Sequence, residues 1–296
     1  MPVLSRRQLV VLVLLTLVWG FNWPVMKLGV THFPPLSFRA LSMWIALPLL
    51  ALVMWRQRLS FRIERAHWPR LALLTLTNMV LWHVLMILAL PLLSSGRAAI
   101  LGYTMPIFSA VLGALVFGDR LAGRAWGGVA AAALGVALLL WHQVGALGSR
   151  PLGMVLILVS AASWALGTQL LRRLQLPVPL LTLSFWMVAL TTLVLSALAL
   201  AFERPQWHAP NAQAWGAIVY NAVLVMCFAQ IAWFFLVRSL PPVASTLSVM
   251  LIPVIGVFSG AWWLGEVLRW QDWAAVALMV LAIASVLWPA RNKKSA

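Results

Sequence analysis

Residues 106–126 read PIFSAVLGALVFGDRLAGRAW, and residues 253–273 read PVIGVFSGAWWLGEVLRWQDW. The two stretches align without a gap at a separation of 147 residues, so that proline meets proline, Gly-Asp meets Gly-Glu and tryptophan meets tryptophan. At a similar separation of 145 residues, Trp19 matches Trp164. Self-similarity at a fixed period indicates that the chain consists of two related halves.

The composition is typical of a membrane protein. Of the 296 residues, 64% are hydrophobic and 9% are charged, with only five acids, which is too little charge to coat a soluble domain of this size. A membrane-spanning helix takes about 20 mostly apolar residues, so the chain has room for about ten spans with short loops and for no attached catalytic domain. We expect the spans near residues 8–30, 35–55, 70–92, 97–118, 123–141, 152–173, 179–201, 214–237, 242–264 and 270–289.

The net charge of +16 comes from basic residues that gather at the ends of the apolar runs. With the N-terminus placed in the cytoplasm, the inside segments hold fifteen Lys and Arg residues and the outside loops hold four. This bias predicts the orientation, with both termini cytoplasmic and an even number of spans, in a bacterial inner membrane. We therefore interpret the charge as a topology signal and expect a lipid bilayer, not a nucleic acid, as the partner.

Ten spans in two halves place five spans in each half, and we expect a first repeat over residues 1–145 and a second over residues 146–296. Because five is odd, the second repeat enters the membrane in the opposite orientation. Lys27 and Arg172 match each other in the two halves, one at the outer end of its span and the other at the inner end. The sequence therefore predicts an all-α membrane protein of ten transmembrane helices in two inverted five-helix repeats, with a substrate site near the bilayer midplane between them.

Three features resemble the EamA-type transporters of the drug/metabolite transporter superfamily: ten spans in two five-span halves, the early Trp19 and Trp164, and the Pro…Gly-acid…Trp pattern. The resemblance covers essentially the whole chain. Within that superfamily, the tryptophan-rich and strongly basic chain is most similar to the YddG-type exporters of aromatic and other neutral amino acids. The resemblance implies export from the cytoplasm by alternating access.

Polar and aromatic side chains within the spans are the first candidates for a binding site, because polar groups in lipid are costly unless they pair or face a cavity. In the first span, Trp19, Asn22, Trp23 and Met26 follow each other at helical spacing on one face. The third span carries a similar stripe, and Gln230 matches His83 at the separation of 147 residues. The predicted substrate-binding residues are Trp19, Asn22, Asn78, Trp82, His83, Tyr103, Trp164 and Gln230.

This set suits a neutral or zwitterionic amino acid with an aromatic side chain. Trp and Tyr rings stack on aromatic solutes and attract an ammonium group, while Asn, Gln and His offer hydrogen bonds without a fixed charge. We place no Arg or Lys at mid-depth, which argues against phosphorylated substrates. Each residue also has a purely structural interpretation: helix packing for the tryptophans, and interhelical hydrogen bonding for Asn78 and Gln230.

Four other features have structural interpretations of the same kind. Asp119 and Glu266 are predicted to be helix caps or partners in loop salt bridges. Pro106 and Pro253 are predicted to kink the fourth and ninth spans. The glycine pairs Gly123/Gly127 and Gly256/Gly260 are predicted to allow close helix packing.

The sequence does not identify what drives transport, because none of the five acids lies at mid-span, where a proton-coupling carboxylate is usually found. His83 is a candidate proton site or substrate ligand, or simply a buried histidine, and facilitated diffusion is an alternative. We expect no enzyme, no cofactor and no metal site, since the five histidines are scattered and no nucleophile constellation is present. The alternative function is export of other small metabolites or drugs, such as purines or non-aromatic amino acids.

Overall fold

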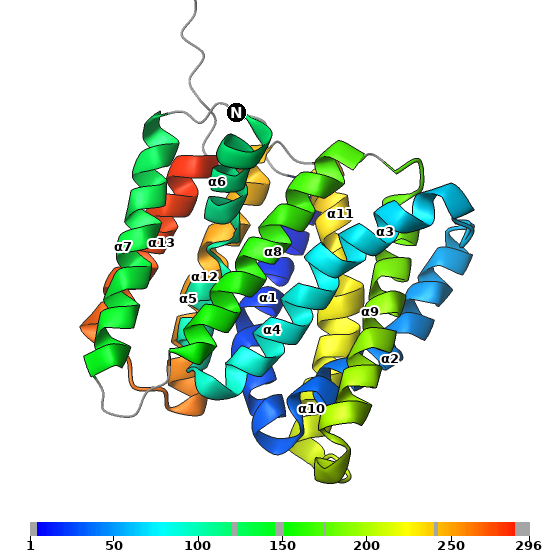
Figure 1. The fold of residues 1–296 in the computed structure, drawn as a ribbon, viewed down its shortest axis with the longest axis horizontal. Helices are drawn as coiled ribbons and strands as arrows, with labels where there is room; N and C mark the ends of the chain where they lie inside the picture. Colours follow the sequence, from blue (N-terminus) through cyan, green and yellow to red (C-terminus); the bar gives the residue numbers. More distant parts are fainter. Residues whose placement is uncertain (1–4, 120–122, 146–150, 175, 240–241, 288–296) are drawn as a thin grey trace, which may run out of the picture.

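The structure is a computed structural model, and it describes residues 5–119, 123–145, 151–174, 176–239 and 242–287. The regular structure of these residues is helical, and the helices form one bundle (Figure 1). Seven of the described segments are long and apolar enough to cross a membrane, and three shorter helices are apolar as well. The predicted fold class, an all-α membrane protein with ten spans, is therefore confirmed.

The first half contains two uninterrupted helices, two composite spans and a fifth helix. Their bounds are α1 (Arg6–His32); α2 (Pro35–Arg56); η1 (Arg65–His67), α3 (Trp68–Thr75), the π-helical η2 (Leu76–Val80), α4 (Leu81–Ala89) and η3 (Leu90–Leu92); α5 (Ser95–Gly102) and α6 (Met105–Phe117); and α7 (Gly123–Gly145).

The second half repeats this order after residue 150. Its elements are α8 (Leu152–Leu174); α9 (Leu180–Phe202) with η4 (Arg204–Gln206); α10 (Ala212–Val219), the π-helical η5 (Tyr220–Ala229) and α11 (Gln230–Ser239); α12 (Pro242–Leu264); and α13 (Trp270–Leu287). The predicted boundary between the repeats at residue 145/146 and the end of the last span at residue 289 touch residues outside the described ranges, as do Arg120, Arg150 and the three basic residues after 290.

The two halves run in opposite directions through the bundle. The end of α1 lies beside the end of the third span, because Lys27 Nζ donates to the carbonyl oxygens of Leu90 and Pro91 at 2.9 and 3.1 Å. The start of α8 lies at this same face, with Gly153 packed against Leu92 and Leu93. Helices α1 and α8, which are equivalent in the repeat, are therefore antiparallel. We call the face where α1 begins the N-terminal face and the other the opposite face.

The packing of the helices follows the same two-fold relation. Helix α1 packs against α12, and its equivalent α8 packs against α6 and α5. Helix α4 packs against α8, and its equivalents α10, η5 and α11 pack against α1. The remaining major pairs join equivalent helices to each other: α7 with α13 at one side of the bundle, α2 with α9 at the other, and α5 with α12 between them (Figure 1).

The repeated Gly-acid pair ends a helix in the same way in both halves. Gly118 and Gly265 have φ angles of 72° and 65°, in the left-handed region that favours glycine and closes helices. The backbone N–H groups of Asp119 and Glu266 then donate to the carbonyl oxygens of Gly113 and Gly260, at 2.8 and 3.4 Å. The repeat that is visible in the sequence therefore encodes a helix stop.

The repeated proline has different geometry in the two halves. Pro106 stands in the first turn of α6, just after a break at Tyr103 and Thr104 that divides the fourth span. Pro253 lies inside the uninterrupted helix α12. The same motif is thus found in two conformations, which makes the halves unequal at this place.

Both halves carry a π-helical segment in their third span. Segment η2 covers residues 76–80 and η5 covers residues 220–229, and a shift of 147 residues places the first within the second. Wider π-turns interrupt the regular hydrogen bonds of a helix and are common at functional sites. Neither segment is marked by a proline or a glycine that would reveal it in the sequence.

The predicted glycine contacts are correct for one pair only. A Cβ atom at Gly256 would lie 2.7 Å from Ala99 Cβ, and one at Gly260 would lie 2.6 Å from Glu266 Oε2. The prediction for Gly123 and Gly127 is wrong, because a Cβ at either meets no atom of the described residues within 4 Å. The close contact of α7 with α13 is made by the next residue, Gly128, which faces Ser285 and Ala282.

Candidate functional site

Four aromatic rings form a cluster where the two halves meet. Trp23 and Tyr103 pack edge to face with ring centroids 6.3 Å apart, and Trp82 and Trp164 do the same at 5.4 Å. Gly102 joins the pairs, since a Cβ there would lie 2.6 Å from the Trp23 ring and 3.6 Å from the Trp82 ring. We call Trp23, Trp82, Tyr103 and Trp164 the aromatic cluster. It brings together three predicted residues and adds Trp23.

Asn78 lies beside this cluster and connects the two halves. Its side-chain nitrogen is 3.4 Å from the carbonyl oxygen of Trp164 and 3.4 Å from the hydroxyl of Thr168. Ser163 on the same helix donates to the Thr77 carbonyl at 2.7 Å. The structural interpretation of Asn78 as an interhelical hydrogen-bonding residue is therefore confirmed, at the contact between η2 and α8.

A second, polar cluster centres on Arg39 of α2. The guanidinium Nη1 donates to Asn221 Oδ1 of η5 at 3.1 Å, and Nη2 lies against the Met26 sulfur of α1. The side-chain nitrogen of Asn22 reaches the same sulfur at 3.4 Å. We call Asn22, Met26, Arg39 and Asn221 the Arg39 cluster. Arg39 lies in the first turns of α2 and its side chain is 1% exposed, so the bundle holds a buried arginine that the predicted site did not include.

Three buried polar atoms near this cluster have no hydrogen-bond partner within the described ranges: Asn22 Oδ1, Arg39 Nε and His83 Nδ1. His83 on α4 is 5% exposed and lies within electrostatic reach of the Arg39 charge. Native interiors leave very few such groups unsatisfied, so each one calls for an explanation. A polar ligand would supply the missing partners.

Two further predicted residues are half-buried. Trp19 packs against the small cluster of Leu15, Ala229, Ala232 and Leu236, where α1 meets η5 and α11, and also against the main hydrophobic core that contains Trp23, Trp82 and Tyr103. Gln230 is half-buried at the first position of α11. On the one-face stripe of α1, Asn22 and Met26 contribute to the Arg39 cluster and Trp23 to the aromatic cluster.

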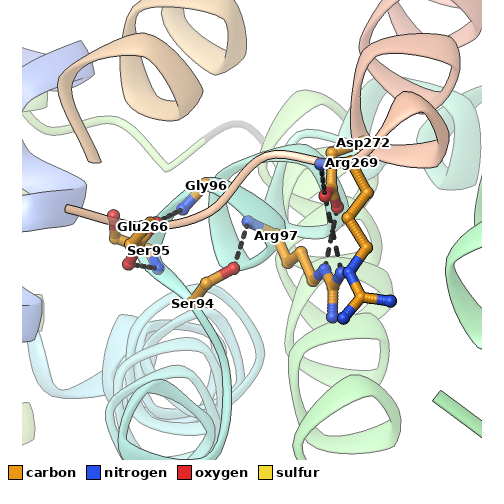
Figure 2. Close-up of polar contacts among 7 residues, drawn as sticks. All are labelled: Ser94, Ser95, Gly96, Arg97, Glu266, Arg269 and Asp272. Carbon is orange, nitrogen blue, oxygen red and sulfur yellow. Dashed lines mark hydrogen bonds and ion pairs between the residues drawn. The ribbon is translucent and has the colours of Figure 1, made fainter. Parts of the chain in front are cut away.

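The opposite face is joined across the halves by acidic groups (Figure 2). Glu266, after α12, accepts hydrogen bonds from the N–H groups of Ser95 and Gly96 at the start of α5, at 2.5 and 3.1 Å. Asp272 of α13 pairs with Arg97 of α5 at 2.8 Å. Anions are favoured at a helix N-terminus, so these contacts hold α5 against α12 and α13. Glu266 is the predicted helix cap, but of another helix than its own.

The equivalent acid at the N-terminal face makes a different contact. Asp119 pairs with Arg173 of α8 at 2.8 Å, and the two side chains are 51% and 33% exposed. Arg173 also donates to the side-chain oxygen of Gln169 and lies over the Phe117 ring at 4.0 Å. The prediction of a loop salt bridge is confirmed for Asp119, and the two ends of the bundle are closed by unequal contacts.

A hollow of about 470 Å³ opens at the opposite face, where α1 turns into α2. It is lined by residues 30–35 and by Gln206, His208 and Asn211. None of the predicted substrate-binding residues lines it. The candidate site is instead the closely packed interior formed by the aromatic cluster and the Arg39 cluster.

Comparison with known proteins gives the family of this two-fold bundle. Residues 7–141 and residues 151–288 each match the EamA-like transporter family. The chain belongs to this family. EamA proteins are transporters, and the double match covers nearly all of the chain.

Full-length relatives are found among bacterial membrane proteins. The chain is 28% identical to the uncharacterized inner membrane transporter YedA of Escherichia coli, over 94% of this chain and 91% of the relative. It is 25% identical to a probable amino-acid metabolite efflux pump of Salmonella typhimurium, over 99% of each chain. A solved crystal structure with 20% identity aligns over 95% of this chain and 98% of its own, with a TM-score of 0.69, which shows that the fold is shared.

Proposed function

We propose that this EamA-family transporter exports neutral amino acids, aromatic ones above all, through the interior where its two halves meet. The observation that carries the proposal is the aromatic cluster beside unsatisfied buried polar groups. Flat rings provide stacking surface for an aromatic side chain, and the polar groups provide partners for the amino-acid backbone. The efflux activity in the name of the Salmonella relative supports a solute of this kind.

Alternating access is the mechanism that we propose for this export. The two halves, taken as residues 1–145 and 146–296, carry the same sequence motif in two conformations: a broken fourth span and an unbroken α12. In an inverted repeat, each half can adopt the conformation of the other half. This exchange closes the substrate pathway at one face of the membrane and opens it at the other. The stronger contacts of Glu266 and Asp272 at the opposite face support a state in which that face is closed.

The proposed setting is the bacterial inner membrane with both termini in the cytoplasm. Five arginines, at positions 56, 58, 62, 65 and 70, lie between the second and third spans and anchor the N-terminal face on the cytoplasmic side. The inner membrane location in the name of YedA supports this setting. The opposite face then faces outward.

Counterflow into liposomes tests the substrate class directly. Vesicles that contain the purified protein are loaded with unlabelled tryptophan, threonine or a nucleoside, and uptake of the same labelled compound is followed. We expect accumulation with tryptophan first and threonine second. Accumulation with the nucleoside alone would instead establish the alternative function, export of purine-like metabolites.

Replacing Trp164 by leucine is expected to lower transport of tryptophan about threefold to tenfold, because an aromatic pair contributes roughly 0.5–1.5 kcal/mol beyond its buried area. Transport of threonine should change little, since threonine has no ring to stack. The initial rate of counterflow as a function of concentration measures both. The matched control is Trp215→Leu, which removes an exposed ring on α10. Equal losses for tryptophan and threonine would contradict a stacking role.

A further inference from the structure

Arg39 is a buried charge without a counter-ion in the described structure. Among the described residues, its guanidinium donates to two uncharged groups, the amide oxygen of Asn221 and the sulfur of Met26. Its Nε has no partner among the described residues. The nearest ring, that of Phe38, lies 5.9 Å away, at the limit of a cation–π contact.

The chain has no acid left to pair with Arg39. All five acids lie in the described ranges, and each is accounted for elsewhere. Glu203 accepts from the N–H groups of Leu36 and Ser37, Glu266 caps α5, Asp272 pairs with Arg97, Asp119 pairs with Arg173, and Glu64 is exposed. The neutralising charge must therefore come from outside the chain.

Burying an unpaired guanidinium among membrane helices is costly, and a charged residue in such a place is a functional-site hypothesis by default. The planar fork of arginine matches the two oxygens of a carboxylate. Lys27, another basic residue of the first two spans, is engaged with the Leu90 and Pro91 carbonyls. One free positive charge fits one negative charge, which favours a carboxylate over a phosphate dianion.

The surrounding atoms fit the rest of an amino acid. Asn22 Oδ1 has no hydrogen-bond partner among the described residues and can accept from an ammonium group. Asn22 and Arg39 both reach the Met26 sulfur, so this flexible side chain lies between the two groups and can move aside for a ligand. Trp23, the neighbour of Asn22, begins the aromatic cluster.

We propose that Arg39 binds the α-carboxylate of the transported amino acid, that Asn22 accepts from its ammonium group, and that the aromatic cluster holds its side chain. This assignment rests on the proposed function, because it takes an amino acid as the cargo. It makes Arg39 the residue that separates amino acids from amines and amides of the same shape.

The test compares phenylalanine with one ligand that lacks its carboxylate and one that lacks its ammonium group. Binding of L-phenylalanine, L-phenylalaninamide and 3-phenylpropionate to the purified full-length protein is measured by ligand-induced thermal stabilisation over a concentration series. We expect the wild type to bind phenylalanine at least about tenfold more tightly than the amide, as a lost charged hydrogen bond predicts. In Arg39→Gln the two affinities should become equal, and Arg39→Lys should keep part of the preference.

Lys27→Gln serves as the matched control, because it removes a basic side chain of α1 that is engaged elsewhere, and it should keep the preference. Size-exclusion profiles establish that each variant is folded. An Arg39→Gln protein that still prefers phenylalanine tenfold over its amide overturns the assignment of Arg39, while the proposed function stands.

Phenylpropionate separates this assignment from the proposed function. If the wild type binds phenylpropionate in an Arg39-dependent manner but neither binds nor transports phenylalanine, Arg39 is a carboxylate receptor and amino-acid export is wrong. A wild type that binds neither of these two carboxylates contradicts both proposals.

Discussion

Replacing Gly167 by valine is expected to abolish the accumulation of folded protein. A Cβ atom at this position would lie 2.7 Å from Asn78 Cβ and 2.8 Å from both Asn78 Cα and Asn78 N. Backbone atoms cannot rotate away as a long side chain can, so α8 and η2 would have to separate. That separation would also break the contacts of Asn78 and Ser163 that join the two halves.

Overpacking in a well-packed interior typically costs about 1–3 kcal/mol of folding stability. Because the added side chain would clash with backbone atoms here, we expect a loss of stability at or above the upper end of this range. Because the free energy of unfolding of whole domains is only about 5–15 kcal/mol, such a loss removes a large part of the stability of the folded protein. The yield of folded Gly167→Ala protein should lie between the yields of the wild type and of Gly167→Val. The yield of monodisperse protein after solubilisation, and the melting temperature of what remains, measure the effect.

The matched control is Gly216→Val on α10, where an added Cβ meets none of the atoms that the structure describes within 4 Å. We expect this protein to be produced at the wild-type level. If Gly167→Val is produced and melts like Gly216→Val, then α8 does not approach η2 as closely as described, and the interface between the halves is looser.

Glu266→Gln is expected to open the opposite face of the bundle. The carboxylate of Glu266 accepts from two backbone N–H groups at the start of α5, and hydrogen bonds to a charged group contribute roughly 1.5–3 kcal/mol, against about 1 kcal/mol for neutral ones. A loss of about 1–3 kcal/mol shifts the balance between closed and open states by about fivefold to more than a hundredfold.

Cysteine labelling measures this shift. Val257 of α12 is buried against Gly96 and is 1% exposed, so a Val257→Cys side chain reports on the closure without adding bulk. The natural Cys227 is first replaced by serine, which leaves a background without thiols. In Glu266→Gln, a membrane-impermeant maleimide should label position 257 about ten times faster from the outer face.

Asp119→Asn is the control at the N-terminal face, where its ion pair with Arg173 is largely exposed. Exposed pairs contribute at most about 1 kcal/mol, so this variant should leave the labelling at position 257 nearly unchanged. Equal labelling rates in wild type and Glu266→Gln would show that the cap of α5 is not what keeps this face closed.

Much of the fold follows from features that can be counted along the chain. Apolar runs gave the ten spans, and the ungapped repeat from Pro106 to Trp126 and from Pro253 to Trp273 predicted the two related halves and marked where a helix stops. These signals are strong because a span must be long and apolar whatever its neighbours are.

The backbone conformation of the repeated motif could not be predicted from the sequence in this way. Pro106 follows a break in its span, whereas Pro253 lies within a continuous helix. A proline at the same position of the repeat is compatible with both forms and does not distinguish them. The same is true of Gly127 and Gly128, since a shift by one residue rotates the contact face of a helix by about 100°.

The sequence by itself therefore determined the class of this protein, the number and order of its spans, and the family that it resembles. Only the tertiary structure decided which residues form the interior, and it added Trp23 and Arg39 to the predicted set. The reason is physical: lipid and helix contacts are both apolar, so hydrophobicity does not tell the inner face of a span from the outer one. The hydrogen bond from Arg39 to Asn221 joins residues 182 positions apart, and it exists only once α2 and η5 are side by side.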